Sequence, residues 1–259
     1  MKLCGHRVWI LGYGFLGRVL ADKCRAVGAG VLSIDRTAAA GADLCADSAA
    51  AATISQAIEM SGGAPSVIFC CLSTRGGAVA DYRHCYLQTV QNLAAAHLSG
   101  NCIFCSSSSV YGAVTERTAI LEECEQRILS FGGCVARLVP LYGPGRCELL
   151  RRHLAGEPRL PGAPTRVFNY VHVEDAAAAL MLLAEQEVSG ACDVCGESFT
   201  KSGVYEQLAL LTGIAAAAQD APSSKRSTIS RPITADTLRA LGWCPQHSFA
   251  DFVRAQLGK

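Results

Sequence analysis

Short apolar runs alternate with amphipathic stretches over the first two thirds of the chain. The apolar runs lie at residues 7–11, 31–34, 67–71, 102–106, 134–139 and 191–195. Continuous apolar runs of this length are typical of strands buried on both faces, and helical stretches between them supply the crossovers of a parallel sheet. The pattern predicts an α/β fold, with a Rossmann-type doubly wound parallel sheet covered by helices on both faces.

The same pattern predicts helices over residues 46–60, 81–98 and 173–187. Beyond residue 142 the texture changes, and residues 156–166 carry three prolines and two glycines between two helical patterns. Such clusters break regular structure. We therefore predict two parts: a nucleotide-binding domain of residues 1–142 plus 170–195, and a small C-terminal lobe of residues 143–169 plus 196–259.

Composition narrows the possible partners. The chain has 259 residues, half of them hydrophobic, and a formal net charge of +1. It contains no long Lys/Arg run, so neither nucleic acid nor an anionic membrane surface is an expected partner. It also lacks an apolar stretch of about 18 residues, and a signal peptide is not predicted because the glycine motif begins so early. We expect a small-molecule substrate and a monomer or homodimer.

The chain holds 14 cysteines, most of them inside the apolar runs. Free cysteine in such a position behaves as a small buried hydrophobe. The single C-x-x-C, Cys192 to Cys195, has no second pair, so no metal site is predicted. A thiol-rich chain without a disulfide pattern fits a reducing cytoplasm.

A glycine-rich turn follows the first apolar run. The segment reads Gly12-Tyr13-Gly14-Phe15-Leu16-Gly17 and passes directly into a helical pattern. In a strand–turn–helix of this kind, the first glycine permits a tight turn, the second lets a pyrophosphate approach, and the third lets helix and strand pack closely. The helix N-terminus then faces the anion. We predict a dinucleotide site at Gly12, Gly14, Phe15, Leu16 and Gly17.

An acidic residue closes the second strand at the distance that such a site requires. Asp35 follows Gly17 by 18 residues, and a carboxylate there accepts hydrogen bonds from the adenosine ribose, which favours NAD. Arg36 leaves NADP open, because a guanidinium can accept a 2′-phosphate. By position, Asp43 and Leu44 are predicted beside the adenine. Three residues that end the third main strand are predicted to border the nicotinamide ribose: Cys71, Leu72 and Ser73.

The fourth apolar run ends in four serines, Ser106 to Ser109, followed by Val-Tyr-Gly at residues 110–112. Later segments read Y-G-P-G-R at 142–146, Y-V-H-V-E-D-A at 170–176 and L-G-W-C-P at 241–245. In this order the motifs resemble the extended short-chain dehydrogenase/reductase superfamily, in its NAD-dependent epimerase/dehydratase branch. The resemblance implies hydride transfer at a nicotinamide and a small C-terminal lobe that covers the substrate. It also implies that Ser107 hydrogen-bonds the reacting oxygen.

The catalytic Y-x-x-x-K pair of that superfamily is missing. Aligning Glu125 with a glutamate that often follows the pair places Arg117 at the tyrosine position and Leu121 at the lysine position. No tyrosine or lysine lies between Gly112 and Tyr142. The chain therefore resembles a compact member with a non-standard active site.

Three readings remain open for the chemistry. In the first, the chain is an NAD(P)-dependent oxidoreductase or epimerase acting on a small polar substrate, such as a sugar, with Tyr111 handling the proton. In the second, it binds the cofactor without turnover, as a sensor or interaction protein. In the third, ordered water supplies the proton and Ser107 orients the substrate. Arg146 and His172 are predicted to contact the substrate, and no metal is expected.

Overall fold

The computed structural model describes residues 2–38, 41–74, 76–222 and 230–258. Seven parallel strands form one sheet in the order β3-β2-β1-β4-β5-β6-β9. They are β1 (Arg7–Leu11), β2 (Gly30–Asp35), β3 (Leu44–Cys45), β4 (Val67–Cys70), β5 (Cys102–Ser107), β6 (Cys134–Leu138) and β9 (Gly190–Val194). The predicted doubly wound parallel sheet is confirmed, as are the six strands that the apolar runs predicted.

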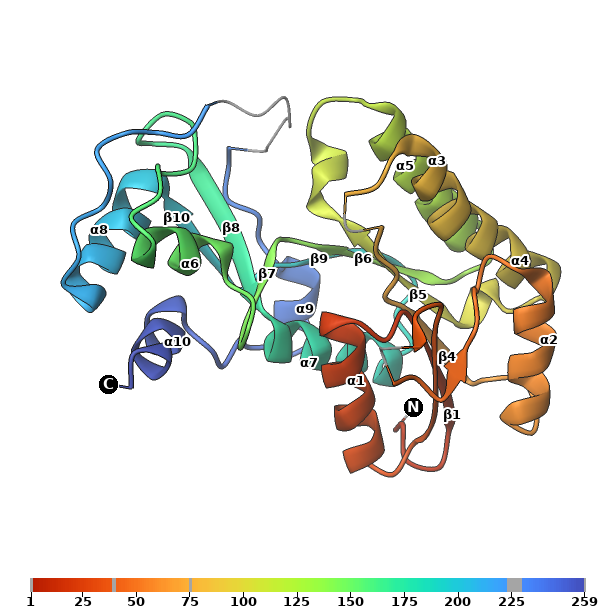
Figure 1. The fold of residues 1–259 in the computed structure, drawn as a ribbon. Coiled ribbons are helices and arrows are strands. Elements are labelled where there is room, and N and C mark those ends of the chain that lie inside the picture. The colour runs from red at the N-terminus through yellow and green to blue at the C-terminus, as the bar shows by residue number, and fades with distance from the viewer. Residues whose placement is uncertain (1, 39–40, 75, 223–229, 259) are drawn as a thin grey trace.

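Helices cover both faces of this sheet because the strands bury apolar side chains on both (Figure 1). One face packs against α1 (Phe15–Ala26), α7 (Val173–Glu185) and α9 (Asp236–Ala240). The other packs against α2 (Ala51–Met60), α4 (Thr89–Ala95) and α5 (Glu116–Ser130). Two separate apolar clusters result, one on each side of the sheet.

Two predicted helices differ from those observed. The helix expected from residue 46 begins at Ala51, because the backbone carbonyl of Asp47 accepts from Ala50 and its carboxylate accepts from the Ala49 N–H. The helix expected over 81–98 consists of α3 (Val79–Tyr82), a π-helical turn η2 (Arg83–Gln88) and α4. The later start of α2 and the π-helical turn leave the hydrophobic periodicity nearly unchanged, so the sequence pattern does not reveal them.

The C-terminal lobe has its own sheet and its own apolar cluster. Its strands are β7 (Leu141–Tyr142), β8 (Val167–His172) and β10 (Glu197–Thr200), in the order β10-β8-β7. The helices α6 (Glu148–Leu154), α8 (Lys201–Thr212) and α10 (Phe249–Gln256) supply side chains to the third cluster. Strand β8 crosses the boundary predicted at residues 169 and 170 and leads directly into α7, so one strand links the lobe to the large sheet (Figure 1).

The strand order reverses direction at β1, which lies between β2 and β4. In open parallel sheets, ligands bind outside the carboxyl ends of the strands at such a reversal. Short 3₁₀ turns flank β5, namely η3 (Ser99–Asn101) and η4 (Ser108–Tyr111). Over the residues described, no helix is both long enough and apolar enough to cross a membrane.

Gly17→Ala is expected to destabilise the protein. A Cβ at Gly17 would lie 2.0 Å from the carbonyl oxygen of Gly12, a backbone atom that cannot move without shifting β1. Overpacking of this kind costs about 1–3 kcal/mol. Urea unfolding would measure the change. Gly14→Ala is the matched control, because a Cβ there meets no atom within 4 Å; equal losses for both variants would contradict the prediction.

Candidate functional site

The glycine turn lies between β1 and α1 at the carboxyl edge of the sheet. A Cβ at Gly12 would lie 2.5 Å from the carbonyl oxygen of Cys71, and Gly12 has a positive φ of 94°. Both observations require glycine there. Within the described part of the chain, no atom lies within 4 Å of a Cβ placed at Gly14. No side chain caps the N-terminus of α1, and its first turn contains no acidic residue. This N-terminus can therefore receive an anion.

Asp35 ends β2 and faces this turn. Its Oδ2 accepts from the Tyr13 N–H at 2.9 Å, and its Oδ1 accepts from the Thr37 N–H at 2.9 Å. Each oxygen keeps a further lone pair for a ligand hydroxyl. Asp35 thus lies where the sequence predicted it, tied to the turn.

A pocket of about 140 Å³ lies at the same edge. It brings together five of the predicted cofactor residues: Gly12, Asp35, Arg36, Leu72 and Ser73. Further lining residues were not predicted: Ile34, Thr37, Ala46, Asp47, Ser48 and Cys85. Asp47 is the most informative of these, because it adds a second carboxylate, held by His84 at 2.8 Å. Its place two residues after the short strand β3 is the signal that could have found it.

The remaining predicted cofactor residues lie outside this pocket. Phe15 and Leu16 form the first turn of α1. Asp43 is occupied elsewhere: its Oδ2 accepts from the N–H and hydroxyl of Ser33 and from Arg25. Burial acts to raise the pKa of Asp43, but these hydrogen bonds outweigh it, so the pKa lies below its usual value. Leu44 is 6 % exposed and belongs to the apolar cluster. The Sγ of Cys71 contacts that of Cys105 at 3.6 Å.

Ser107 and Tyr111 lie at the end of β5 and in the 3₁₀ turn that follows. The Oγ of Ser107 accepts from the Ser109 N–H at 3.2 Å and caps η4. The Tyr111 hydroxyl donates to both carboxylate oxygens of Asp193, at 2.8 and 3.0 Å. Arg137 donates to the same hydroxyl at 3.0 Å. Neither Asp193 nor Arg137 was predicted from the sequence.

These two charged residues belong to one line across the sheet. Ser106, Arg137 and Asp193 are direct register partners on β5, β6 and β9, and we refer to them as the polar row. The signal in the sequence was one charged residue inside each of two otherwise apolar strands, Cys134–Leu138 and Gly190–Val194. Charges are rarely buried without partners, so such residues mark a site or an ion pair.

The residues aligned with the missing catalytic pair and with its following glutamate make different contacts. The Arg117 guanidinium lies 5.5 Å from the ring of Tyr82, and Leu121 is 4 % exposed within the apolar core. Glu125, 3 % exposed, accepts from Arg137 at 2.6 Å and from Ser106 at 2.5 Å. Only Glu125 of the three reaches the polar row.

The two predicted substrate residues are placed differently. Arg146 is exposed, and its guanidinium lies 5.1 Å from the ring of Phe15, so it adjoins the glycine turn from the lobe. His172 is 5 % exposed; its Nδ1 accepts from the Glu174 N–H at the start of α7, and its ring stacks on His247 at 4.2 Å. His172 therefore has a structural role at the junction between lobe and sheet.

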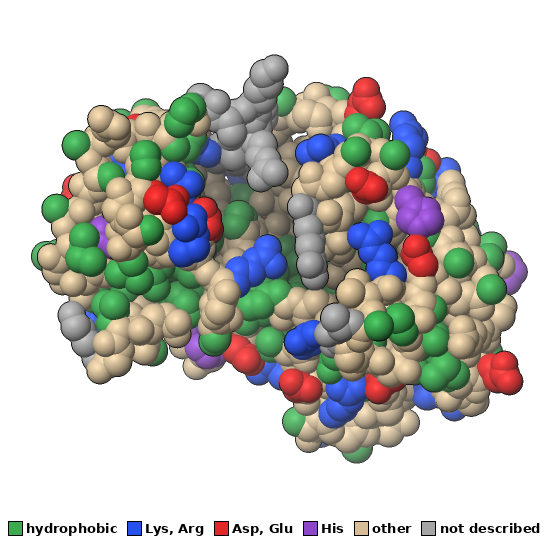
Figure 2. All heavy atoms as spheres, viewed as in Figure 1, with side chains coloured by type: hydrophobic (Ala, Val, Ile, Leu, Met, Phe, Trp, Pro, Cys, Tyr) green, Lys and Arg blue, Asp and Glu red, His purple; other side chains and the backbone are tan. Residues whose placement is uncertain are grey.

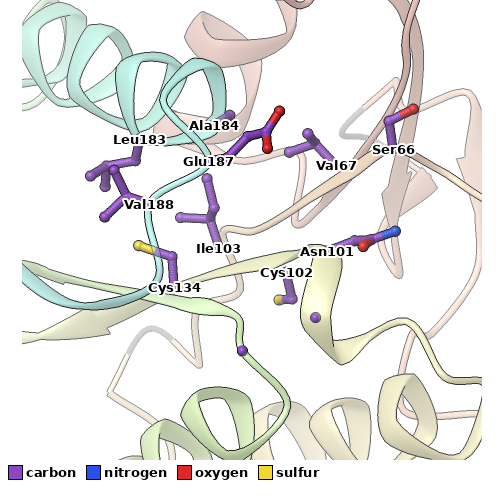
Figure 3. A pocket seen from close by; sticks show the side chains of 12 residues that line it. Ser66, Val67, Asn101, Cys102, Ile103, Cys134, Leu183, Ala184, Glu187 and Val188 are labelled. Carbon is purple, nitrogen blue, oxygen red and sulfur yellow. The ribbon is translucent and has the colours of Figure 1, made fainter. Parts of the chain in front are cut away.

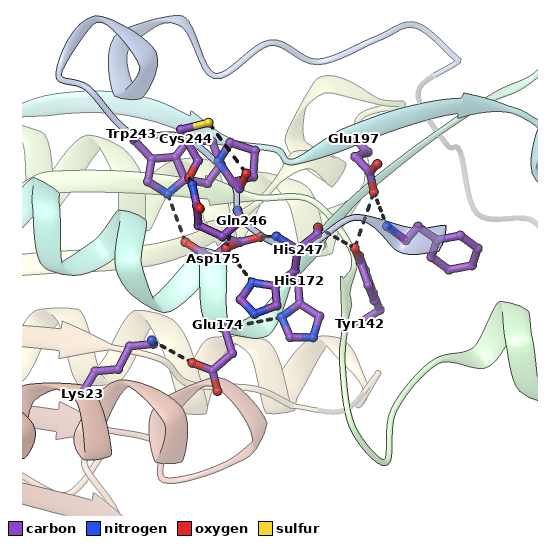
Figure 4. A network of polar contacts seen from close by, with 12 residues as sticks. Lys23, Tyr142, His172, Glu174, Asp175, Glu197, Trp243, Cys244, Gln246 and His247 are labelled. Carbon is purple, nitrogen blue, oxygen red and sulfur yellow. Dashed lines mark hydrogen bonds and ion pairs between the residues drawn. The ribbon is translucent and has the colours of Figure 1, made fainter. Parts of the chain in front are cut away.

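Asp175 organises that junction (Figure 4). Its buried carboxylate accepts from the backbone N–H groups of Gln246 and His247, both at 3.0 Å, and contacts the His247 ring at 2.9 Å. Its carbonyl accepts from the Trp243 indole. The motif at residues 241–245 thus fastens the C-terminal segment to α7.

A larger pocket, of about 290 Å³, lies at the opposite edge of the sheet (Figure 3). Its lining includes Ser66, Asn101 and Cys102, at the amino ends of β4 and β5. The glycine turn and the polar row lie at the other edge, so this pocket is separate from the candidate site. Figure 2 shows a hollow between the lobe and the large domain, with Lys and Arg side chains on both sides. No group of three or more His, Cys, Asp or Glu among the described residues is arranged to hold a metal ion.

Comparison with solved structures identifies the fold. The chain matches the UDP-glucose 4-epimerase of Thermus thermophilus, solved with NAD, at a TM-score of 0.76 and 22 % identity over 96 % of both chains. It matches the dTDP-glucose 4,6-dehydratase of Bacillus anthracis str. Ames, also with NAD, at 0.79 and 14 % identity over 98 % of this chain and 96 % of the other. The chain therefore has the fold of these NAD-bound epimerase and dehydratase structures.

Sequence comparison is more limited. No family model matches the chain. It is 34 % identical over 150 residues to Protein YeeZ of Escherichia coli (strain K12), a match that covers 50 % of this chain and 53 % of YeeZ. The chain thus spans about half the length of this relative.

Acid is expected to destabilise the protein partly through His172. Burial and the neighbouring His247 lower the pKa of His172 below its usual 6.5. The unfolded chain therefore takes up this proton first as pH falls, and stability declines from about pH 6.5 down to the folded pKa, by up to about 1.4 kcal/mol per pH unit. Protonation at Nδ1 would also remove the helix cap.

Urea unfolding from about pH 7 to about pH 5 tests this expectation. His172→Asn keeps a capping side chain without the titration and should show a shallower loss of stability on the acid side. Identical slopes in the two proteins would contradict the assignment.

Proposed function

We propose that this protein is an NAD-dependent oxidoreductase or epimerase of the nucleotide-sugar epimerase/dehydratase type, acting on a small polar substrate. The observation that carries the proposal is the placement of a dinucleotide cradle and a serine–tyrosine pair along one edge of the sheet. The cradle comprises Gly12, Gly14 and Asp35, and the pair is Ser107 and Tyr111. The fold of the NAD-bound neighbours supports this reading.

The cradle suits NAD in three respects. The uncapped N-terminus of α1 would face the pyrophosphate, and the open space at Gly14 would admit it. Asp35 would accept from the adenosine ribose. Asp35 and Asp47 both line the pocket, beside Arg36, and two carboxylates disfavour the 2′-phosphate of NADP.

The chemistry would be hydride exchange at a substrate carbon that carries a hydroxyl, with nicotinamide as the hydride acceptor and donor. Ser107 would hydrogen-bond the reacting oxygen, since a hydroxyl can both donate and accept. Tyr111 would move the proton of that oxygen. Arg146 lies beside the glycine turn and would grip an anionic group such as the diphosphate of a nucleotide sugar.

A second candidate is a protein that binds NAD and does not turn substrate over. It is favoured by the absence of Y-x-x-x-K and by the Tyr111 hydroxyl, which both Asp193 and Arg137 engage. Such a protein would act as a sensor or interaction partner. Cofactor binding alone does not separate the two candidates, whereas turnover does.

Calorimetric titration with NAD⁺, NADH, NADP⁺ and NADPH tests the cofactor site. We expect micromolar binding of the NAD pair. Asp35→Ala should weaken NAD binding about 10- to 100-fold, which is the contribution of one hydrogen bond to a charged group. The difference in affinity between NAD and NADP should become smaller. Asp22→Ala, an exposed residue on α1, is the control. If none of the four nucleotides binds, the proposal is wrong.

Ser107→Ala is expected to abolish turnover while leaving NAD affinity unchanged. Two assays with UDP-glucose and NAD⁺ follow turnover. Nicotinamide absorbance detects net oxidation, and NMR of the sugar detects epimerisation, which returns the hydride and leaves NAD⁺ unchanged overall. Ser109→Ala is the matched control. It removes an exposed hydroxyl but keeps the Ser109 backbone N–H that donates to Ser107. Turnover of Ser107→Ala within a few-fold of the wild type would make the serine cluster structural.

A further inference from the structure

We propose that Asp193 is the proton partner of Tyr111, and that Arg137 is the fixed cation beside it. This inference rests on the proposed function, and it assigns the polar row as the substitute for the missing tyrosine–lysine pair. The Tyr111 hydroxyl donates to Asp193 at 2.8 Å and accepts from Arg137 at 3.0 Å, so one oxygen joins a carboxylate and a guanidinium.

The cation is held rigidly. Glu125 takes two nitrogens of Arg137, with distances of 3.0 Å to Nε and 2.6 Å to Nη2, while Ser106 donates to the other oxygen of Glu125. A bidentate pair fixes the plane of the guanidinium. Nη1 remains directed at Tyr111, and the Cζ of Arg137 lies 5.0 Å from the Tyr111 ring. This rigid attachment is what an exposed surface arginine lacks.

The carboxylate of Asp193 is placed to receive a proton. Burial raises the pKa of Asp193, while Tyr111, Arg137 and Arg231 offset part of that effect. Burial, followed by Asp193, also raises the pKa of Tyr111, so the phenol is protonated at neutral pH. Both pKa shifts make the two groups hold a proton more strongly than usual, so Tyr111 passes its proton to Asp193 only as it accepts one from the substrate.

Among the described residues, four charged groups lie next to Tyr111 or behind its partners. Asp193 lies on β9, Arg137 on β6, and Glu125 on α5 behind Arg137. Arg231, which precedes α9, places its Cζ 5.4 Å from the centroid of the Tyr111 ring. Two carboxylates and two guanidinium groups therefore balance while Tyr111 is neutral. Loss of the Tyr111 proton to Asp193 preserves that balance.

The proton step is as follows. A bound nicotinamide would supply the hydride acceptor. When the substrate carbon is oxidised, the substrate O–H bond breaks and its electron pair forms the carbonyl. The proton bonds to Oη of Tyr111, and the former Tyr111 proton bonds to Oδ1 of Asp193. In the reverse direction Asp193 returns the proton through Tyr111. Arg137 stabilises negative charge on Oη during either transfer.

Ionisation of Tyr111 in the cofactor-free protein tests this assignment. NMR of tyrosine labelled at Cζ follows each phenol against pH, and Tyr111→Phe identifies the Tyr111 signal. In Asp193→Asn the Tyr111 pKa should fall, because the cation remains and the carboxylate is gone. In the double variant Glu125→Gln/Arg137→Gln it should rise, and no buried carboxylate is left without its partner.

These titrations test whether Asp193 and Arg137 act on the Tyr111 phenol, and the kcat and KM of Asp193→Asn test the proton relay itself. Glu123→Gln/Arg127→Gln removes an exposed ion pair of the same helix, with side chains 40 % and 43 % exposed, and is the matched control. If Asp193→Asn does not fold, the Tyr111 pKa in Glu125→Gln/Arg137→Gln tests the assignment by itself. An unchanged Tyr111 pKa in the variants that fold would overturn the assignment.

The measurement is independent of cofactor binding. Failure to bind NAD would remove the proposed function without altering these titrations, and unchanged titrations would overturn the relay even in a protein that binds NAD. In a protein that turns over UDP-glucose, Asp193→Asn should lower kcat at least about 100-fold, the usual contribution of acid–base catalysis, with KM and NAD affinity unchanged. Asp193→Glu should restore part of kcat.

Discussion

Close backbone packing between β1 and α1 is the constraint on which the rest of this structure depends. Gly17 allows the helix to approach within van der Waals distance of the Gly12 carbonyl, and Gly12 in turn lies against the carbonyl of Cys71. Three segments therefore meet without side chains between them, at the point where the strand order reverses. Because these segments pack so closely, the uncapped N-terminus of α1 and the carboxylate of Asp35 lie beside the same turn.

The other half of the same edge is organised by charge. A buried ion pair gives little net stability, because desolvation of both ions offsets their attraction. Glu125 and Arg137 are nevertheless placed in the sheet, with Ser106 completing the hydrogen bonds of the carboxylate. Such an arrangement fixes orientation more than it adds stability. It holds the guanidinium of Arg137 against the hydroxyl of Tyr111.

The lobe is coupled to the sheet by polar contacts at one junction. Asp175 in α7 binds the backbone of Gln246 and His247, and the Tyr142 hydroxyl donates to the His247 carbonyl at 3.1 Å. Strand β8 and helix α7 are continuous through His172. The position of Arg146 beside the glycine turn therefore depends on segments about a hundred residues apart in the chain.

The sequence by itself determined the architecture and the glycine-turn half of the candidate site. Apolar runs predicted the strands, because a strand buried on both faces needs apolar residues at nearly every position. The glycine spacing and Asp35 are local requirements, set by one turn and one strand end, so they can be read within some 25 residues.

Only the tertiary structure decided the other half. The polar row joins Ser106, Arg137 and Asp193 through strand register, and register between distant strands leaves no trace in local spacing. The same holds for Asp47, which reaches the pocket beside the glycine turn through the turn after β3, and for His172, whose ring the lobe covers. Asp43 was placed beside the adenine by position alone, and in the structure its carboxylate accepts from Ser33 and Arg25. Side-chain partners are settled by packing, since each polar group takes the nearest complementary one that folding brings to it.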